Sequence, residues 1–180
     1  MPVANASKIA FCGVCGAISV VIMILAGVFT TMSLALPALA GCVLISVTVE
    51  LSEKYGFLVF SVVAVLSFFL TADKEAFVIY LLFFGYYPVL FSLLCKIKNI
   101  FLAYFIKFAL FNVAAILDYV IITFILGIPM EYSESFGMWF LPALLLFANV
   151  IFVLYDRCLY GIVQIYFQRL HPIARRFIKK

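Results

Sequence analysis

An uncharged apolar run over residues 9–29 constrains this chain more than any other feature. A helix of that length rises about 30 Å, which is the thickness of the hydrocarbon core of a bilayer. The rest of the sequence has the same character, because 68% of its residues are hydrophobic and only 11% are charged. A soluble domain carries about 25% charged residues and could not bury this much apolar surface. The sequence therefore predicts an integral membrane protein.

Six apolar segments predict an all-α fold, with six transmembrane helices in a single bundle. The predicted helices span 9–29, 34–49, 57–71, 76–95, 100–127 and 136–156. Lipid offers the backbone no hydrogen-bond partners, so each spanning segment must satisfy its own N–H and C=O groups as a helix. The second and third helices are short, and the pair can alternatively form a re-entrant hairpin that does not cross completely. We expect one helical membrane domain over 1–170, with an amphipathic, basic C-terminal segment over 157–180.

Basic residues predict the orientation of the bundle. One set of helix ends holds ten of the twelve Lys and Arg residues: Lys8, Lys54, Lys96, Lys98, Arg157, Arg169, Arg175, Arg176, Lys179 and Lys180. The opposite set holds only Lys74. Cytoplasmic loops are enriched in Lys and Arg, so we expect both termini in the cytoplasm of a bacterium and the bundle in its plasma membrane. The C-terminal segment would lie against anionic headgroups of the inner leaflet.

The predicted helix 100–127 carries two ionisable residues. Lys107 and Asp118 share one helix face and lie about 16 Å apart along the axis. We favour Lys107 as an anchor whose ammonium reaches the headgroup region. Asp118 is either a contact for a cationic or hydrogen-bonding group of a substrate, or a residue that is hydrogen-bonded to a neighbouring helix. Both interpretations of Asp118 remain open at this stage.

Three further features offer candidate ligand contacts. Pro88 lies in the middle of the helix 76–95, frees a backbone carbonyl one turn earlier and kinks the helix. Tyr86 and Tyr87 next to it would offer ring faces and hydroxyl groups to a small organic ligand, or are simply packed in the kink. Asn112 and Asn149 lie near mid-membrane, where an amide contact between helices is favoured over a ligand contact. At the start of the same helix 76–95, a cap by Thr71 or Asp73 is expected.

A stripe of small residues follows one side of the first helix. Ala6, Ala10, Gly13 and Ala17 are spaced by four, three and four residues, which permits close approach of another helix. The stripe predicts either internal packing or a docking face for a partner protein. No HExxH, GxSxG or Walker A motif occurs, and His171 is the only histidine. We therefore expect no enzymatic activity, no cofactor, no metal site and no nucleic-acid binding.

This layout resembles the substrate-binding (S) component of energy-coupling factor transporters. That family consists of hydrophobic chains of similar size with six helices and cytoplasmic termini. Its first helix carries a stripe of small residues, matched here by Ala6-Ser-Lys-Ile-Ala10 and Gly13-Val-Cys-Gly-Ala17. The resemblance implies that the stripe contacts a transmembrane coupling subunit above two ATPases. It also implies that a vitamin-like nutrient is held in the outer half of the bundle.

Two hypotheses for function follow. The first is a membrane-embedded substrate-binding subunit of an uptake transporter for a small organic solute, energised by partner ATPase subunits. Its candidate ligand contacts are Asp118, Tyr86, Tyr87, Asn112 and Asn149, and its candidate docking residues are Ala6, Ala10, Gly13 and Ala17. The alternative is a non-transporting membrane scaffold or assembly protein, in which the polar residues only pack helices together.

Overall fold

The protein is all-helical in a computed structural model that describes residues 2–127 and 140–170. The elements are α1 (Pro2–Val28), η1 (Thr30–Met32), α2 (Ala35–Glu50), α3 (Glu53–Leu70), α4 (Lys74–Ile79), η2 (Tyr80–Phe84), α5 (Tyr87–Leu94), α6 (Ile100–Val120), η3 (Ile121–Ile125), α8 (Phe140–Ile165) and η5 (Tyr166–Leu170). The short 3-10 turn η1 joins two helices, whereas η2, η3 and η5 are π-helical turns that continue the helix before them. The prediction of an all-α fold is confirmed.

Within the described ranges, five helices are long and apolar enough to cross a membrane. They span Ala6–Val28, Glu53–Leu70, Lys74–Leu94, Ile100–Ile125 and Pro142–Gln168. The remaining predicted helix, α2, is also apolar but contains only 16 residues. It therefore rises about 24 Å, less than the thickness of a typical hydrocarbon core. Five to six apolar helices indicate a membrane protein, and a complete crossing by α2 stays a prediction.

The last helix continues beyond the end of its apolar run. The sequence bounds the membrane-spanning part at 156 and indicates an amphipathic helical pattern after it, and α8 and η5 run on without interruption to Leu170. The start of the C-terminal segment 157–180 is therefore a continuation of this helix, and residues 171–180 lie outside the described ranges. Asp156 can lie inside the helix because its carboxylate is buried against a lysine of α6.

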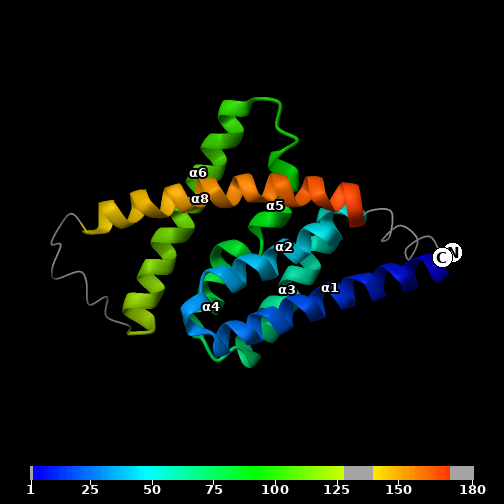
Figure 1. Cartoon of the computed structure of the whole chain (residues 1–180), viewed down its shortest axis with the longest axis horizontal. Helices are drawn as coiled ribbons and strands as arrows, with labels where there is room; N and C mark the ends of the chain where they lie inside the picture. Colours follow the sequence, from blue (N-terminus) through cyan, green and yellow to red (C-terminus); the bar gives the residue numbers. More distant parts are fainter. Residues whose placement is uncertain (1, 128–139, 171–180) are drawn as a thin grey trace.

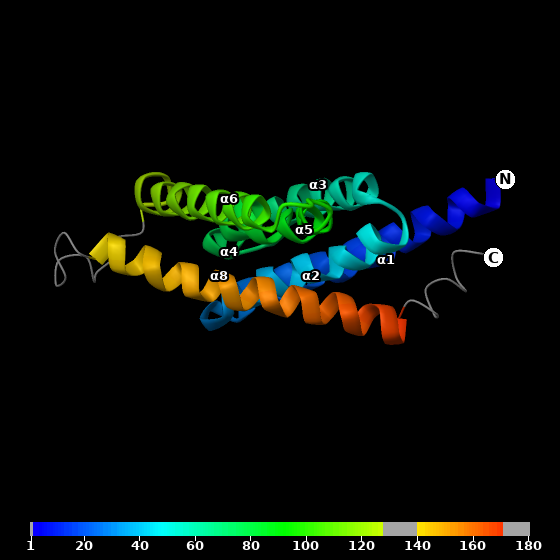
Figure 2. The ribbon, with the colours of Figure 1, turned by 90° about the horizontal axis from the view of Figure 1, so that it is seen from above.

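Helix α2 is the centre of the assembly. It contacts α1, α3, α4, η2, α5 and α8, whereas α6 packs mainly on η2 and α8. In Figure 1, α1 and α8 follow the long axis and α6 crosses α8 at a steep angle. In Figure 2, α8 lies on one side of α2, and α3 and α5 lie on the other. Helices α6 and α8 contact each other where they cross, and each also contacts the central helices, α6 through η2 and α8 through α2.

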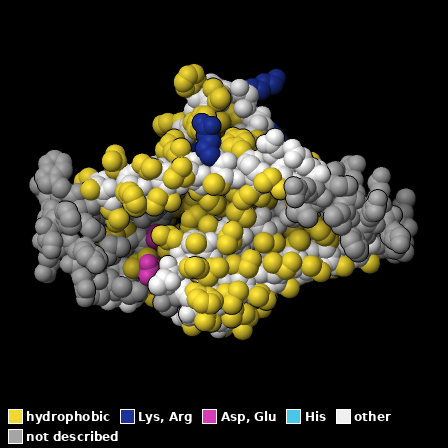
Figure 3. Space-filling model, viewed as in Figure 1, with side chains coloured by type: hydrophobic (Ala, Val, Ile, Leu, Met, Phe, Trp, Pro, Cys, Tyr) yellow, Lys and Arg dark blue, Asp and Glu magenta, His cyan; other side chains and the backbone are white. Residues whose placement is uncertain are grey.

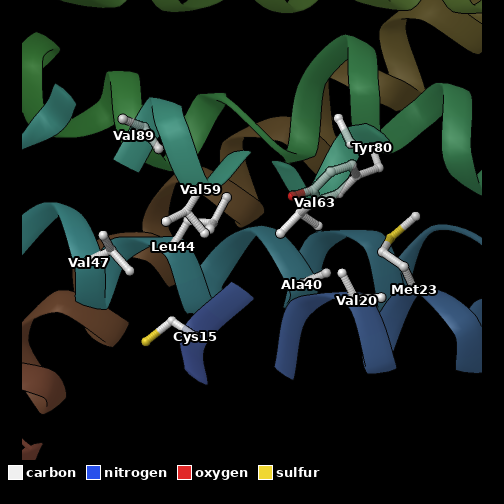
Figure 4. Close-up of a cluster of buried hydrophobic side chains, with 11 residues drawn as sticks. Cys15, Val20, Met23, Ala40, Leu44, Val47, Val59, Val63, Tyr80 and Val89 are labelled. Carbon is white, nitrogen blue, oxygen red and sulfur yellow. The ribbon is translucent and has the colours of Figure 1, made fainter. Parts of the chain in front are cut away.

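Two apolar clusters hold the helices together. The first joins α1, α2 and α3 around Cys15, Leu44 and Val63, with Tyr80 inserted from η2 (Figure 4). The second is largely aromatic and joins η2, α5, α6 and α8. At its centre the ring of Phe152 stacks on Phe111 at 4.6 Å between centroids. The α6–α8 pair is therefore attached through aromatic contacts.

The described surface is strongly apolar, as a bilayer-embedded protein requires. The face in Figure 3 is covered largely by hydrophobic side chains. On α6 and η3, Phe101 is 85% exposed and Phe124 is 78% exposed. Without a partner protein or lipid around them, such side chains would make the molecule insoluble.

The start of α1 and the end of η5 lie at the same end of the molecule (Figures 1 and 2). We call this the inner end, and we call the opposite end, which holds η1 and the start of α4, the outer end. The names follow the predicted orientation. Assignment of the inner end to the cytoplasm stays a prediction, because it depends on the distribution of Lys and Arg.

The predicted break at Pro88 is confirmed. The helix 74–94 is divided into α4, the π-helical turn η2 and α5, and the N–H of Gly85 donates to the carbonyl of Tyr80 at 2.7 Å. Pro88 lies in the first turn of α5, where its missing N–H is not needed. At the other end of this segment, Oδ1 of Asp73 accepts from the N–H groups of Glu75 and Ala76 at 3.0 and 3.2 Å. Of the two predicted caps, Asp73 is the one that forms.

Candidate functional site

A cavity of about 360 Å³ opens toward the outer end of the molecule. It lies among the starts of α2 and α4, the turn η2, the second half of α6 with η3, and the first half of α8. The wall is mostly apolar and includes Phe83, Phe111, Ala115, Leu145, Phe147 and Ala148. Small-molecule sites have this size and this character, with few polar groups in a hydrophobic wall.

Two carboxylates line this outer cavity: Asp118 from α6 and Glu75 from the first turn of α4. Asp118 is half-buried, and its Oδ1 is buried without a hydrogen-bond partner among the described residues. In Figure 3, acidic side chains lie beside a hollow between α8 and the start of α4. A buried carboxylate without a partner is costly, so this position calls for an explanation. Glu75 is a member of this site that the sequence did not identify as a ligand contact.

The nearest cation in the sequence does not neutralise the two acids. Lys74 precedes Glu75, but its ammonium donates to the carbonyls of Phe68 and Thr71 at 2.9 and 3.1 Å. These carbonyls belong to the end of α3, where a cation is favourable. Among the described residues, no ion pair joins a Lys or Arg side chain to Glu75 or Asp118.

The two tyrosines beside the helix break do not line the outer cavity. Tyr87 is fully buried, its ring stacks on Phe83 at 4.6 Å, and its hydroxyl donates to Oδ1 of Asp156 at 2.6 Å. Tyr86 is half-buried, with its ring edge-on to Phe60 at 6.1 Å. The structure therefore separates both tyrosines from Asp118 and uses Tyr87 in packing between α5 and α8.

Asn112 of α6 and Asn149 of α8 form a reciprocal pair, as the favoured interpretation predicts. Each side-chain N–H group donates to the other's Oδ1, at 3.1 and 3.0 Å. Each amide also donates to the carbonyl four residues earlier in its own helix, at 2.8 Å. All four side-chain N–H donors are thereby used within the protein, and neither residue lines the outer cavity. The pair fixes the register of α6 against α8.

This pair allows a quantitative prediction. Replacement of Asn112 and Asn149 by leucine, singly and together, should give a coupling energy of about 0.6–1.7 kcal/mol in a double-mutant cycle. The measurement is the free energy of unfolding in a mild detergent titrated with a denaturing detergent. A second double-mutant cycle, which combines Asn112 with Ser61, is the control. Ser61 is an exposed residue of α3 whose hydroxyl donates to the carbonyl of Phe57 in its own helix, so this cycle should give a coupling energy near zero. Equal coupling in both cycles would contradict the proposed contact.

Lys107 is the clearest correction to the sequence interpretation. It is only 2% exposed, so its ammonium does not reach the headgroup region as predicted. It donates instead to Oδ1 and Oδ2 of Asp156 at 2.7 and 2.9 Å, and to the hydroxyl of Tyr160 at 3.3 Å. The ring of Phe91 lies 4.7 Å from the ammonium and adds a cation–π contact. This buried ion pair joins α5, α6 and α8.

A second, smaller cavity lies beside this ion pair. It has a volume of about 230 Å³ and is lined by the end of α5, the start of α6 and Tyr160 of α8. Lys98 and Lys107 are its charged members. Since all three donors of Lys107 are used by Asp156 and Tyr160, only Lys98 offers a free charge there.

The small-residue stripe of α1 faces away from the rest of the protein. Ala6, Ala10, Gly13 and Ala17 are all exposed, and a Cβ added at Gly13 would meet no described atom within 4 Å. The opposite side of α1 carries the buried residues Ser19 and Met23, and Ser19 donates to the carbonyl of Ala40 at 2.9 Å. Internal packing of the stripe is therefore excluded for the described residues, and its use for docking stays a prediction.

Comparison with protein-family models, with curated proteins and with solved structures gives no match for this chain. The resemblance to S components thus stays a prediction from the layout of the sequence.

Proposed function

We propose that this protein is the membrane-embedded substrate-binding subunit of an uptake transporter for a small organic solute. The observation that carries the proposal is the outer cavity, in which Asp118 presents a buried oxygen without a partner among the described residues. A volume of about 360 Å³ lies within the range of small-molecule sites. In the predicted orientation this cavity faces the extracellular side, from which a nutrient would enter.

Partner subunits complete the proposal. The sequence has no nucleotide-binding motif, so the energy for transport would come from ATPase subunits through a transmembrane coupling subunit. The exposed stripe on α1 is the proposed contact for that coupling subunit, because small residues let a second helix approach closely. The complex would act in the plasma membrane with both termini of this chain in the cytoplasm.

Filling the cavity tests the proposal without changing its charge. Ala148 lines the wall, so Ala148→Phe should displace a bound solute. Native mass spectrometry of gently purified protein is expected to show a small molecule retained by the wild type and reduced about tenfold or more in this variant. Val150→Phe is the matched control, because Val150 lies on the same helix, is 54% exposed and does not line the cavity.

The same purification separates the transporter from a scaffold. Co-purification of a coupling subunit and ATPases with the chain supports transport. Retention of solute by Ala148→Phe at the wild-type level would mean that the cavity is not the site. If the wild type holds no solute and brings no ATPase with it, the scaffold hypothesis replaces the transporter.

A further inference from the structure

The charge balance of the outer cavity points to the chemistry of its ligand. Two carboxylates face one apolar space, and the cations close to them in the sequence are engaged elsewhere. The ammonium of Lys74 is bound to carbonyls at the end of α3. Lys107 lies about 16 Å from Asp118 along α6 and is paired with Asp156. In an apolar environment an ionised carboxylate must be paired, and in the described part of the chain no side chain provides that pair.

A metal ion does not suit this cavity. Ca²⁺ takes 6–8 oxygen ligands and Mg²⁺ requires about six in octahedral order. The described residues contain no group of three or more His, Cys, Asp or Glu side chains placed to hold a metal. Among the described residues, the wall of the outer cavity is hydrophobic apart from the two carboxylates and Tyr119. A bare or hydrated metal ion would therefore lie against hydrocarbon for most of its surface.

An organic cation fits both parts of the wall. An ammonium group pairs with a carboxylate through charge-assisted hydrogen bonds, which are stronger than those between neutral groups. The apolar body of the same molecule would lie against Phe83, Phe111 and Phe147. Aromatic rings also favour a cation that approaches their faces. The cavity thus combines an acidic region with an aromatic wall.

We propose that the outer cavity binds a protonated amine with an apolar body, and that Asp118 and Glu75 are its counterions. The inference rests on the proposed function, since it names the substrate class of that same site. Asp118 is the main contact because its Oδ1 is buried and unpartnered among the described residues. Glu75, in the first turn of α4, is the secondary contact and adds to the attraction of a cation.

Matched pairs of probes test this proposal directly. Tryptamine, 2-phenylethylamine and hexylamine are compared with their hydroxyl analogues tryptophol, 2-phenylethanol and 1-hexanol. Binding to the full-length protein in lipid nanodiscs is measured by isothermal titration calorimetry. At least one amine is expected to bind about tenfold or more tightly than its alcohol, because only the amine carries a charge. The absence of a preference in all three pairs overturns the proposal.

Two variants test whether Asp118 and Glu75 cause the preference for amines over alcohols. Asp118→Asn keeps the size of the side chain and is expected to remove most of the preference, and Glu75→Gln is expected to reduce it less. Glu53→Gln is the control, since Glu53 pairs with Lys96 and does not line the outer cavity. An unchanged preference in both cavity variants overturns the role of the acids. Circular dichroism of each variant verifies folding. The comparison of amines with alcohols on the wild-type protein does not depend on the folding of any variant.

The outcomes separate this inference from the proposed function. If Ala148→Phe expels a retained solute that proves to be neutral or anionic, solute binding stands and the amine class fails. If amines bind with the expected preference but no ATPase subunits accompany the chain, the site stands and the transport function fails.

Discussion

Replacement of Lys107 by methionine is expected to lower the free energy of unfolding by about 3–5 kcal/mol, which is the cost of leaving one charge of a buried pair alone. The carboxylate of Asp156, which is 3% exposed, would keep only the Tyr87 hydroxyl as a donor among the described residues. Such a loss is a large part of the stability of a small domain. The measurement is unfolding of the purified protein in a mild detergent, followed by far-ultraviolet circular dichroism.

The double variant Lys107→Met/Asp156→Leu distinguishes a lost ion pair from a lost contact. It removes both charges and keeps apolar volume at both positions, so it should recover most of the stability that the single variant loses. Recovery follows because no buried charge remains without a partner. A double variant that is as unstable as Lys107→Met alone would mean that packing of the lysine chain, and not its charge, carries the effect.

Lys98→Met is the matched control for this experiment. Lys98 lies in the loop before α6, is exposed, and makes no ion pair with a described residue. Its replacement should change the free energy of unfolding by no more than about 0.5 kcal/mol. Equal losses for Lys98→Met and Lys107→Met would contradict the burial of the ion pair.

The sequence predicts those features that depend on one segment at a time. Lipid forces each apolar run to satisfy its own backbone, so the helical runs can be located from hydropathy alone. Pro88 breaks the helix 74–94 and Asp73 caps the start of that same helix, because both effects come from the residue and its immediate neighbours. That Asn112 and Asn149 each make an amide contact with another helix is also predicted by the sequence, whereas their pairing with each other is given by the structure.

Contacts between two or more helices cannot be predicted from the sequence in the same way as features within one segment. In the sequence, Asp156 follows the apolar run that ends at Tyr155 and stands next to Arg157, and nothing in that pattern marks it as a partner for Lys107. One signal was available: apolar residues continue after Asp156, at Leu159, Ile162 and Val163, so this acid lies within a longer helix that has one apolar, packed side. Pairing across helices also depends on the angle at which α6 crosses α8, and no pattern within a single segment gives that angle.

The same limit applies to the candidate site. Asp118 is identified from the sequence because a carboxylate in a membrane helix is unusual. Glu75 is not, because an acid in the first turn of a helix is explained by the helix dipole. Only the assembly of several helices around the outer cavity brings Glu75 to the same space as Asp118, and the contact with Asp156 directs Tyr87 away from it.

A second large loss of stability is expected at Gly41, because α2 contacts the helix break before Pro88 at this residue. Pro88 has no N–H to donate to the carbonyl of Phe84 one turn earlier, and Gly41 packs directly against that carbonyl. A Cβ at position 41 would lie 1.9 Å from Phe84 O and 2.9 Å from its carbonyl carbon. Both atoms belong to the backbone, so they cannot move aside as the end of a side chain would.

Gly41→Ala should therefore destabilise the protein by about 3 kcal/mol or more, at or beyond the usual upper limit for overpacking, although alanine favours a helix by about 1 kcal/mol over glycine. Gly161→Ala in α8 is the matched control, since a Cβ there meets no described atom within 4 Å. It has the same gain in helix propensity without the clash, and should be neutral or stabilising in the same detergent titration. The difference between the two variants isolates the contact of α2 with η2. If Gly41→Ala were as stable as Gly161→Ala, α2 could not approach the break this closely, and the wall of the outer cavity that η2 forms would have to be placed differently.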